Sequence, residues 1–468
     1  MSGRLTGEAL RFSHTCGKTS HFARFPVSIV LVCVVGIGIR PCHSESGKRP
    51  YDLAACIRMA FASSPSIQAA EADLQIAENR LQQVYAARFL PGLDFTWTVG
   101  PSPEARGDAL TGVSNWRRMS VFTRTEVALV QPLFTFGKLK AAVEAASGGI
   151  GARRAGLTGS RFDLEQQVAR AYYLLLLANQ LRELAHESRG EIDRARRTIV
   201  EKLEADTGDF TYTDLHRIDR FVYDVEENAN KVVKSQGLAR SALRMLTGLS
   251  ESDSLVLAEA SLKPVDVRIR PPEYYLSLVE GRPDLGQLRE GLRLRSAQVR
   301  AVRTDLFPQV FLAGRFRYGF APNRDRQRNP FLKDEFNVTE LGAVLGFRQS
   351  LSFASTKAKV KEARLSYEKL GYQAQLAVQG ARLEIESAYL SLIEAQANIG
   401  AARKARRATR RWFVSARDGF NAGLEEAGDM VDAVKEYGII RAKYYQAVLE
   451  FNLAWIALQR ATGNSILE

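Results

Sequence analysis

One pair of ionisable side chains, Asp429 and Asp432, has a spacing that suggests a functional site in this 468-residue chain. The pair follows Gly423, which interrupts a long helical pattern, because glycine costs about 1 kcal/mol relative to alanine inside a helix. Residues three apart share one face of a helix, so the two carboxylates would attract cations at one point. The spacing leaves a second interpretation open, a solvated helix face, which is the usual setting of charge on a helix.

The sequence offers little else for catalysis or for metal binding. Behind the predicted signal peptide the only histidines are His186 and His216, and neither lies in a histidine and cysteine cluster of the kind that holds a metal. No nucleophile elbow, phosphate-binding loop or dinucleotide glycine motif occurs. We therefore predict that the protein is not an enzyme and has no metal site.

The first 44 residues are interpreted as a signal peptide, residues 1–44. Basic residues precede an apolar run from Val27 to Ile39, which is shorter than the roughly 20 residues of a membrane-spanning helix. Cleavage is expected after Ser44, and lipidation at Cys42 is the alternative. Cleavage would leave Cys56 as the one cysteine, which excludes a disulfide within the mature chain.

The chain carries a net charge of +13, which could serve a nucleic acid or an anionic membrane. The basic residues are spread along helices and in two loops, without a basic motif interleaved with aromatic residues, so we expect no nucleic-acid partner. No apolar run of about 18 residues follows the signal peptide, so we expect no membrane-spanning helix. Such an exported chain is periplasmic, secreted or an outer-membrane barrel.

The elements around the two carboxylates occur twice. Landmarks recur at offsets of 215 to 217 residues, in the pairs Leu90 and Phe307 (each before a proline), Tyr172 and Tyr389, Gly208 and Gly423, and Gly248 and Gly463. A period this long indicates two fused halves rather than a solenoid. We predict an internal duplication with a first repeat at 45–249, a linker at 250–272 and a second repeat at 273–463.

Each repeat is expected to contain two shorter helices, two strands and a hairpin of long helices. The first long helix is predicted from Lys138 to about Glu204, and the second from Lys357 to about Asp418. Both carry heptad seams, which indicate coiled-coil packing. For the first, ordinary helices broken at Gly148-Gly149 or at Gly190 are the alternative.

Four segments alternate between apolar and polar residues, the pattern of a strand with one apolar face. They are predicted at about 92–100, 120–131, 309–320 and 338–349, and 101–118 is expected to be a polar loop. Four isolated strands leave open edges, and lipid admits strands only in closed barrels, so three chains would supply twelve strands. The residues that suit a lipid-facing band are Phe95, Trp97, Phe320 and Phe347. The alternative is a small soluble sheet packed on helices.

The ordered set of these features resembles the TolC family of bacterial outer-membrane efflux proteins over about Tyr51 to Gly463. The resemblance rests on the duplication, on the proline that precedes the first strand of each half, on Gln131-Pro132-Leu133-Phe134 and on the two tip turns. It implies a mainly α fold with a membrane β-barrel. In a homotrimer, four strands per chain would close a twelve-stranded barrel, and a long coiled-coil helical barrel would cross the periplasm. It also implies that no cofactor is bound.

The resemblance assigns roles to single residues. Asp429 and Asp432 match the aspartates at the constricted periplasmic entrance. There, six carboxylates from three chains would focus a cation-attracting field and raise one another's pKa. The residues that match adaptor-contacting helix tips are Gly208, Asp214, Gly423 and Leu424.

The sequence therefore predicts the outer-membrane channel component of a tripartite efflux or type I secretion system, in the bacterial outer membrane and extending into the periplasm. It would be a passive trimeric conduit, opened by a periplasmic adaptor (membrane fusion) protein and driven by an inner-membrane transporter. The alternative is a periplasmic coiled-coil scaffold or adaptor protein without a pore. That alternative explains the helices and the signal peptide, but it does not explain four strands of bilayer length.

Overall fold

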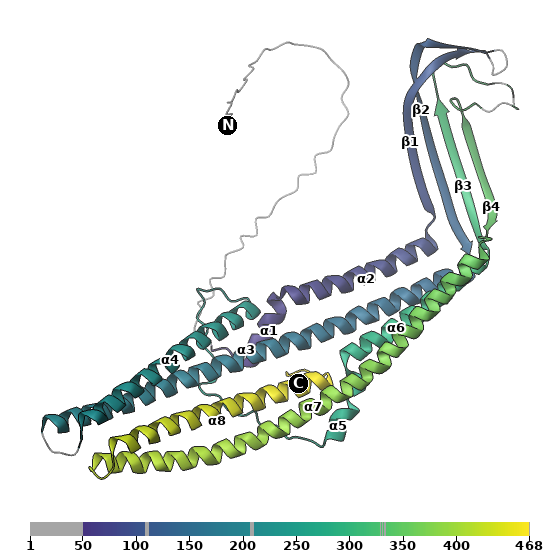
Figure 1. Cartoon of the computed structure of the whole chain (residues 1–468). Coiled ribbons are helices and arrows are strands. Elements are labelled where there is room, and N and C mark those ends of the chain that lie inside the picture. The colour runs from purple at the N-terminus through teal and green to yellow at the C-terminus, as the bar shows by residue number, and fades with distance from the viewer. Residues whose placement is uncertain are drawn as a thin grey trace, which may run out of the picture. The chain divides into compact units, whose positions relative to one another are not determined.

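The computed structural model of the chain describes residues 50–107, 112–205, 210–327, 329, 331 and 334–467. The predicted signal peptide, residues 1–44 with Cys42, lies outside the described residues. The helices are α1 (Leu53–Ser63), α2 (Pro65–Phe89), α3 (Lys138–Glu204), α4 (Tyr212–Thr247), α5 (Pro272–Ser277), α6 (Pro283–Arg303), α7 (Phe353–Asn421) and α8 (Ala427–Thr462), with short 3-10 helices at η1 (Val279–Gly281) and η2 (Thr304–Leu306) (Figure 1). The strands are β1 (Gly92–Arg106), β2 (Val113–Phe134), β3 (Gln309–Phe320) and β4 (Thr339–Arg348). The repeated order of helices and strands confirms the predicted duplication.

The two long helices run without a break. α3 has 67 residues and α7 has 69, so each is about 100 Å long at a rise of 1.5 Å per residue. The alternative of ordinary helices broken at Gly148-Gly149 or at Gly190 is therefore wrong, because α3 is continuous through these positions. Gly148 has a packing role instead, because a Cβ at this position would lie 3.0 Å from the backbone nitrogen of Leu294 in α6. The missing side chain lets α6 approach α3 closely.

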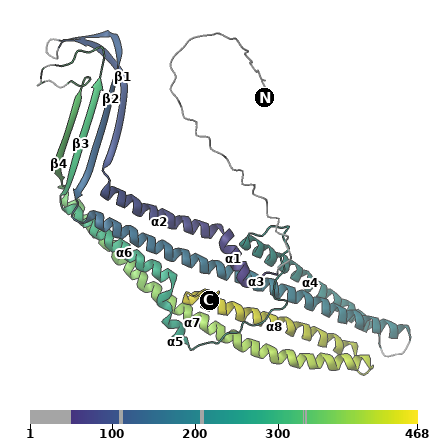
Figure 2. The same cartoon turned by 180° about the vertical axis from the view of Figure 1, so that it is seen from behind.

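The long helices lie side by side in a layer whose order changes along its length (Figures 1 and 2). Near the sheet the order is α2, α3, α6 and α7, and farther from the sheet it is α4, α3, α8 and α7. The layer therefore ends in α7 on one flank and in α2 and α4 on the other. This order makes α7 the outermost helix of the second repeat over its whole length.

Two hydrophobic clusters hold the layer together. The larger cluster includes Tyr172, which is fully buried and donates a hydrogen bond of 3.2 Å from its hydroxyl to the carbonyl oxygen of Tyr51. The second, here called the tip cluster, consists of Ile192, Ala195, Ile199, Phe210, Ile218, Phe221, Phe413, Phe420, Ala427, Met430 and Val434. It joins the α3–α4 hairpin to the α7–α8 hairpin at their far ends. Burying one such large side chain contributes roughly 1.5–3 kcal/mol.

The segment between the repeats is fixed to α8. Asn452 of α8 is fully buried. Its side-chain oxygen accepts a hydrogen bond of 3.0 Å from the Val265 N–H, and its amide nitrogen donates one of 2.9 Å to the carbonyl oxygen of Lys263. Leu262, next to this contact, is 3% exposed. The linker is therefore part of the packed structure.

The four strands form one antiparallel sheet in the order β1-β2-β3-β4. The prediction of a loop over 101–118 is wrong, because β1 continues to Arg106 and β2 begins at Val113. The two strands pair through this region across a register shift between Pro103 and Glu104. Cross-strand hydrogen bonds satisfy the backbone whatever the side chains are, so the polar residues there do not end the strands.

Candidate functional site

The sheet has one apolar face. Residues directly opposite each other on neighbouring antiparallel strands lie on the same face, and one row across all four strands is Phe95, Val127, Phe316 and Leu341. The four aromatic residues singled out from the sequence all lie on this face: Phe95, Trp97, Phe320 and Phe347. Their exposed fractions run from 41% for Phe320 to 78% for Phe347. A continuous exposed apolar surface of this kind indicates contact with another apolar surface, either a protein or a membrane.

The opposite face of the sheet carries charge. Glu126 of β2 lies 3.4 Å from the guanidinium of Arg315 and 3.9 Å from that of Arg317, both on β3. Arg317 also lies 3.6 Å from Glu340 of β4. The ion pairs connect β2, β3 and β4. This face is therefore suited to contact with water, whereas the other face is suited to contact with an apolar medium.

The turn between α7 and α8 is built on Gly423. Its φ of +73° is the left-handed conformation that favours glycine. The Leu424 N–H donates to the Gly419 carbonyl at 2.8 Å, and the Gly423 N–H donates to the Phe420 carbonyl at 3.1 Å, which together form a Schellman motif. In that motif the residue after the glycine usually packs on a side chain in the last turns of the helix that ends. Here that position is Gly419, which has no side chain, and Leu424 is 83% exposed.

Asp429 and Asp432 lie in the first two turns of α8, on its exposed side. Met430 and Ala433, between and beside them, are 3% and 0% exposed and pack inward. Within the described part of the chain neither carboxylate has a hydrogen-bond or ion-pair partner. The two predicted gate residues therefore lie on one exposed face of α8, where both carboxylates are available to attract cations.

The turn that precedes α4 is held by a capping box. The Asp214 carboxylate accepts hydrogen bonds from the N–H and the hydroxyl of Thr211, at 2.9 and 2.7 Å, and the Asp214 N–H donates to the Thr211 hydroxyl. This gives Asp214 a structural role in starting α4. Gly208, predicted with it as an adaptor contact, lies outside the described residues.

The two tips lie at the same level. The rings of Phe210, just before α4, and Phe420, at the end of α7, have centroids 5.0 Å apart. Phe413 of α7 stacks on Tyr437 of α8 at 5.3 Å. The aromatic contacts place the start of α4 beside the end of α7, so distances along these helices can be counted from one common end.

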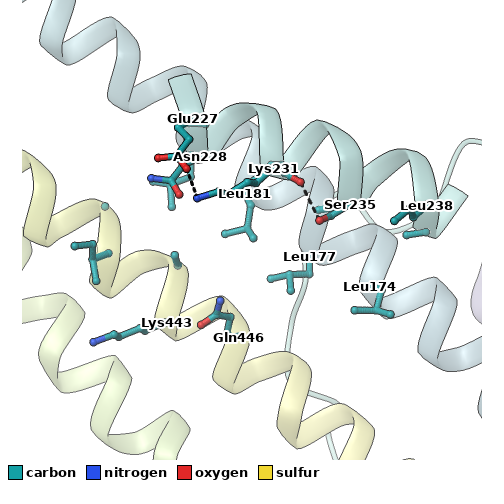
Figure 3. A pocket seen from close by; sticks show the side chains of 18 of the residues that line it. Leu174, Leu177, Leu181, Glu227, Asn228, Lys231, Ser235, Leu238, Lys443 and Gln446 are labelled. Carbon is teal, nitrogen blue, oxygen red and sulfur yellow. Dashed lines mark hydrogen bonds and ion pairs between the residues drawn. The ribbon is translucent and has the colours of Figure 1, made fainter. Parts of the chain in front are cut away.

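The sequence did not predict a groove of about 1230 Å³ lined by α3, α4 and α8. Figure 3 shows Leu174, Leu177 and Leu181 of α3 on its floor, with α4 and α8 on either side. Leu238 of α4 and Lys443 of α8 lie along its length. Heptad analysis of single helices could not find it, because the groove arises from the spacing of two hairpins.

The described residues include neither a helix suited to crossing a membrane nor a cluster of metal-ligating side chains. Among them, no helix combines the length and the hydrophobicity needed to cross a membrane. Nor do the histidine, cysteine, aspartate and glutamate side chains of that part of the chain come together in a group of three or more that could hold a metal ion.

Comparisons with known proteins agree on one family. A sequence model described as "outer membrane efflux protein" matches residues 56–249 and 275–464. Outer membrane protein OprJ of Pseudomonas aeruginosa is 24% identical over 268 residues, which are 57% of this chain and 54% of OprJ. The match thus spans about half the length of that relative.

Solved structures show the same fold. The outer-membrane channel OprN aligns over 88% of this chain and 90% of its own, with a TM-score of 0.72 and 18% identity. The CmeC outer membrane channel of Campylobacter jejuni aligns over 88% of this chain and 85% of its own, with a TM-score of 0.72 and 16% identity. Two separate matched segments in the sequence and one shared fold agree with the duplicated architecture described above.

Proposed function

Because the chain belongs to the outer membrane efflux protein family, we propose that it is the outer-membrane channel of a tripartite efflux or type I secretion system. The protein lies in the outer membrane and extends into the periplasm. It acts as a passive homotrimeric conduit, which a periplasmic adaptor protein opens and an inner-membrane transporter drives. It performs no chemistry of its own on the cargo.

The sheet with two unlike faces carries this proposal. Its apolar face suits lipid, and its charged face suits a water-filled lumen. β1 and β4 are the first and last strands of the sheet, so closure needs further strands beyond both. Placing β4 of one copy beside β1 of the next is a head-to-tail contact, which closes into a ring. Three copies give twelve strands, within the range of 8 to 26 known for such barrels.

The helical layer supports the same ring. Closure would bring α7 of one copy against α2 and α4 of the next. The flank of α7 turned away from its own neighbours exposes large apolar side chains, at Leu365, Tyr372, Leu376, Leu383 and Leu390. A row of exposed apolar residues on one helix face indicates a helical partner.

The acidic pair is proposed as the periplasmic gate. Three copies would bring six carboxylates from Asp429 and Asp432 to one constriction, where like charges favour cations. The absence of any partner for either carboxylate among the described residues supports this role. The gate would restrict the resting channel and pass cations more readily than anions.

The helix tips are proposed as the adaptor contact. Leu424 is a large hydrophobic side chain of the α7–α8 turn that is 83% exposed, and Gly423 holds the turn that presents it. Asp214 lies in the first turn of α4 at the neighbouring tip, and Gly208, outside the described residues, is proposed with it from the sequence. The groove between α3, α4 and α8 is lined from Phe221 of α4 and Val434 of α8 onward, and its apolar floor suits one face of an amphipathic helix.

Fractionation and mass measurement test the proposal. The protein should remain in the outer membrane after a carbonate wash, should require detergent for release, and should have the mass of three chains in detergent. A periplasmic scaffold without a pore would wash off and would not need detergent. A monomer that needs detergent would keep the membrane location and refute the ring.

A further inference from the structure

We propose that a collar of four cations, beside the end of the sheet where the long helices begin, binds the phosphate groups of anionic phospholipids in the periplasmic leaflet of the outer membrane. The collar consists of Lys140 at the start of α3, Arg303 at the end of α6, and Lys357 and Lys361 in the first three turns of α7. The proposal rests on the position of the sheet in the outer membrane and is independent of the gate and of the adaptor contact. It gives part of the net charge of +13 a partner.

The apolar face of the sheet ends in a group of aromatic side chains next to the collar. The last paired row of this face is Phe134, Val310 and Phe347, on β2, β3 and β4. Phe136 lies 4.7 Å from Phe134 and stacks on Phe307 at 5.4 Å, both measured between ring centroids. All four aromatic side chains are at least 41% exposed. Such aromatic residues flank the apolar band of a membrane barrel at the level of the lipid headgroups.

The geometry of the helices places the lysines within reach of the headgroups. Lys140 is the third residue of α3, and Lys357 and Lys361 are the fifth and ninth of α7. They therefore lie about 3, 6 and 12 Å along their helices, at a rise of 1.5 Å per residue. The headgroup layer is about 5–7 Å thick on each side of a bilayer. Side chains tilt toward the N-terminus of a helix, which is here the membrane end, so the long lysine stems extend toward the phosphates.

Lys140 and Arg303 lie on the same side of the helical layer. Glu144 of α3 forms an ion pair with Arg300 of α6. Lys140 precedes Glu144 by four residues and Arg303 follows Arg300 by three, and residues at these spacings share one face of a helix. Both cations therefore lie on the side of the layer that this ion pair marks.

The two lysines of α7 lie on this same side. Near the sheet α7 packs on α6 (Figure 1). Lys357 directly follows Thr356, which is 7% exposed and faces α6, and Lys361 lies one turn farther along. On α3, Lys140 directly precedes Ala141, which is 4% exposed and also faces α6. Because α3 and α7 run in the same direction on opposite sides of α6, a position before the seam of one and a position after the seam of the other face the same side.

The handedness of the chain shows that this is the lipid side. Gly319 of β3 exchanges both backbone hydrogen bonds with Val338, at 2.7 and 3.1 Å, so its N–H and C=O point toward β4. In an upward strand of L-residues these groups point right when the side-chain direction is toward the viewer. Gly319 lies on the charged face, opposite Arg124, so β4 and α7 lie to the right of β3 and α6 from that face. In a right-handed helix that runs away from the sheet, residues after the seam of α7 then turn to the lipid side.

The collar is unpaired within its own chain. All four side chains are exposed, and across the described residues none of them forms an ion pair or a hydrogen bond. The acids nearby on this side, Glu144 and Glu368, are already paired with Arg300 and Arg364. The first turns of α3 and α7 contain no acidic residue, although a cation is unfavourable beside the positive end of a helix dipole. An anion from outside the chain would balance this charge.

An anionic phospholipid fits the aromatic group and the collar together. Its acyl chains would contact Phe136 and Phe307, and its phosphate would lie against the cations in the next turn of the helices. A soluble anion would meet only the cations and would leave the aromatic rings exposed. Each lysine near an anionic membrane surface contributes about fivefold in affinity, so the collar would select lipids by charge.

Native mass spectrometry of the detergent-solubilised trimer tests the collar. The trimer is titrated with phosphatidylglycerol and, separately, with phosphatidylcholine, whose headgroup has no net charge. Wild type should bind phosphatidylglycerol more tightly. Lys357→Gln with Lys361→Gln should weaken that binding about 30-fold, at about fivefold per lysine, and should leave phosphatidylcholine binding unchanged. The matched control, Lys359→Gln with Lys369→Gln, removes the same charge from α7 outside the collar and should behave as wild type.

Inorganic phosphate distinguishes a lipid from a free anion. At the same concentrations it should not displace phosphatidylglycerol, because it has no acyl chains; displacement would assign the collar to soluble anions and overturn the proposal. An equal loss of affinity in the collar and control variants, or no loss in the collar variant, would also overturn it. A wild-type protein that is monomeric or that washes off the membrane would instead refute the proposed function, before any lipid is added.

Discussion

The buried side chain of Asn452 provides the sharpest quantitative test of how the two repeats are joined. In Asn452→Ala the Val265 N–H and the Lys263 carbonyl lose their partners, at 3.0 and 2.9 Å. An unsatisfied buried polar group costs about 1–3 kcal/mol. Because the linker can open to water, we expect a total near the lower end, about 2–4 kcal/mol. At a factor of ten per 1.4 kcal/mol, the open linker should become about 30 to 700 times more populated.

Limited trypsin digestion measures this population. Proteolysis follows the population of the open form when opening and closing are fast. Proline follows both Lys263 and Arg270, so the bond after Arg268 is the tryptic site of this part of the linker. The rate of that single cleavage should rise by the factor above in Asn452→Ala. In the control, Asn228→Ala, the lost hydrogen bond is on an exposed helix face, and the rate should not change. An unchanged rate in Asn452→Ala would refute the docking of the linker.

Further substitutions test the tip turn and the sheet. Gly423→Ala forces a side chain into a φ of +73°, at a cost of about 1–2 kcal/mol, and should reduce hydrogen-exchange protection at the tip. The control is Gly380→Ala, at a position in α7 where a Cβ would meet open space. This change should raise stability by up to about 1 kcal/mol. Equal effects of the two changes would contradict the turn geometry. Trp97→Arg places a charge on the apolar face at a cost of about 2–4 kcal/mol, and should lower the yield of folded protein in the outer membrane, whereas Thr96→Arg, on the charged face, should leave the yield close to wild type. Similar yields would mean that the faces are assigned wrongly.

Local patterns in the sequence were enough to predict the order of the elements. The alternation around Phe95 and Trp97 fixed a strand with one apolar face, and the offset between Gly208 and Gly423 indicated two copies of one unit. Each of these signals depends on residues close in the chain, or on one repeat compared with the other. The length of the β1–β2 hairpin could not be predicted this way, because its outer part is paired by backbone hydrogen bonds and its sequence does not alternate regularly between polar and apolar residues.

The features that sequence reasoning missed depend on contacts between distant segments. Asn452 interrupts the apolar seam of α8 as one polar residue, and only the folded chain shows that the linker backbone lies beside it. The groove between α3, α4 and α8 and the free flank of α7 likewise depend on the order of helices in the layer. Thr211 and Asp214 are different, because their spacing is a capping-box signal that the sequence does contain.

Single-channel recording in planar bilayers is the most direct test of the central claim, that this chain forms a gated conduit. Wild-type trimers should insert and show a small conductance that favours cations. The double variant Asp429→Asn with Asp432→Asn should insert equally well and lose that preference, while Glu450→Gln, an exposed carboxylate farther along α8, should behave as wild type. Folded trimers that never conduct would contradict the conduit, and a conducting pore whose selectivity is the same in all three proteins would contradict the acidic gate.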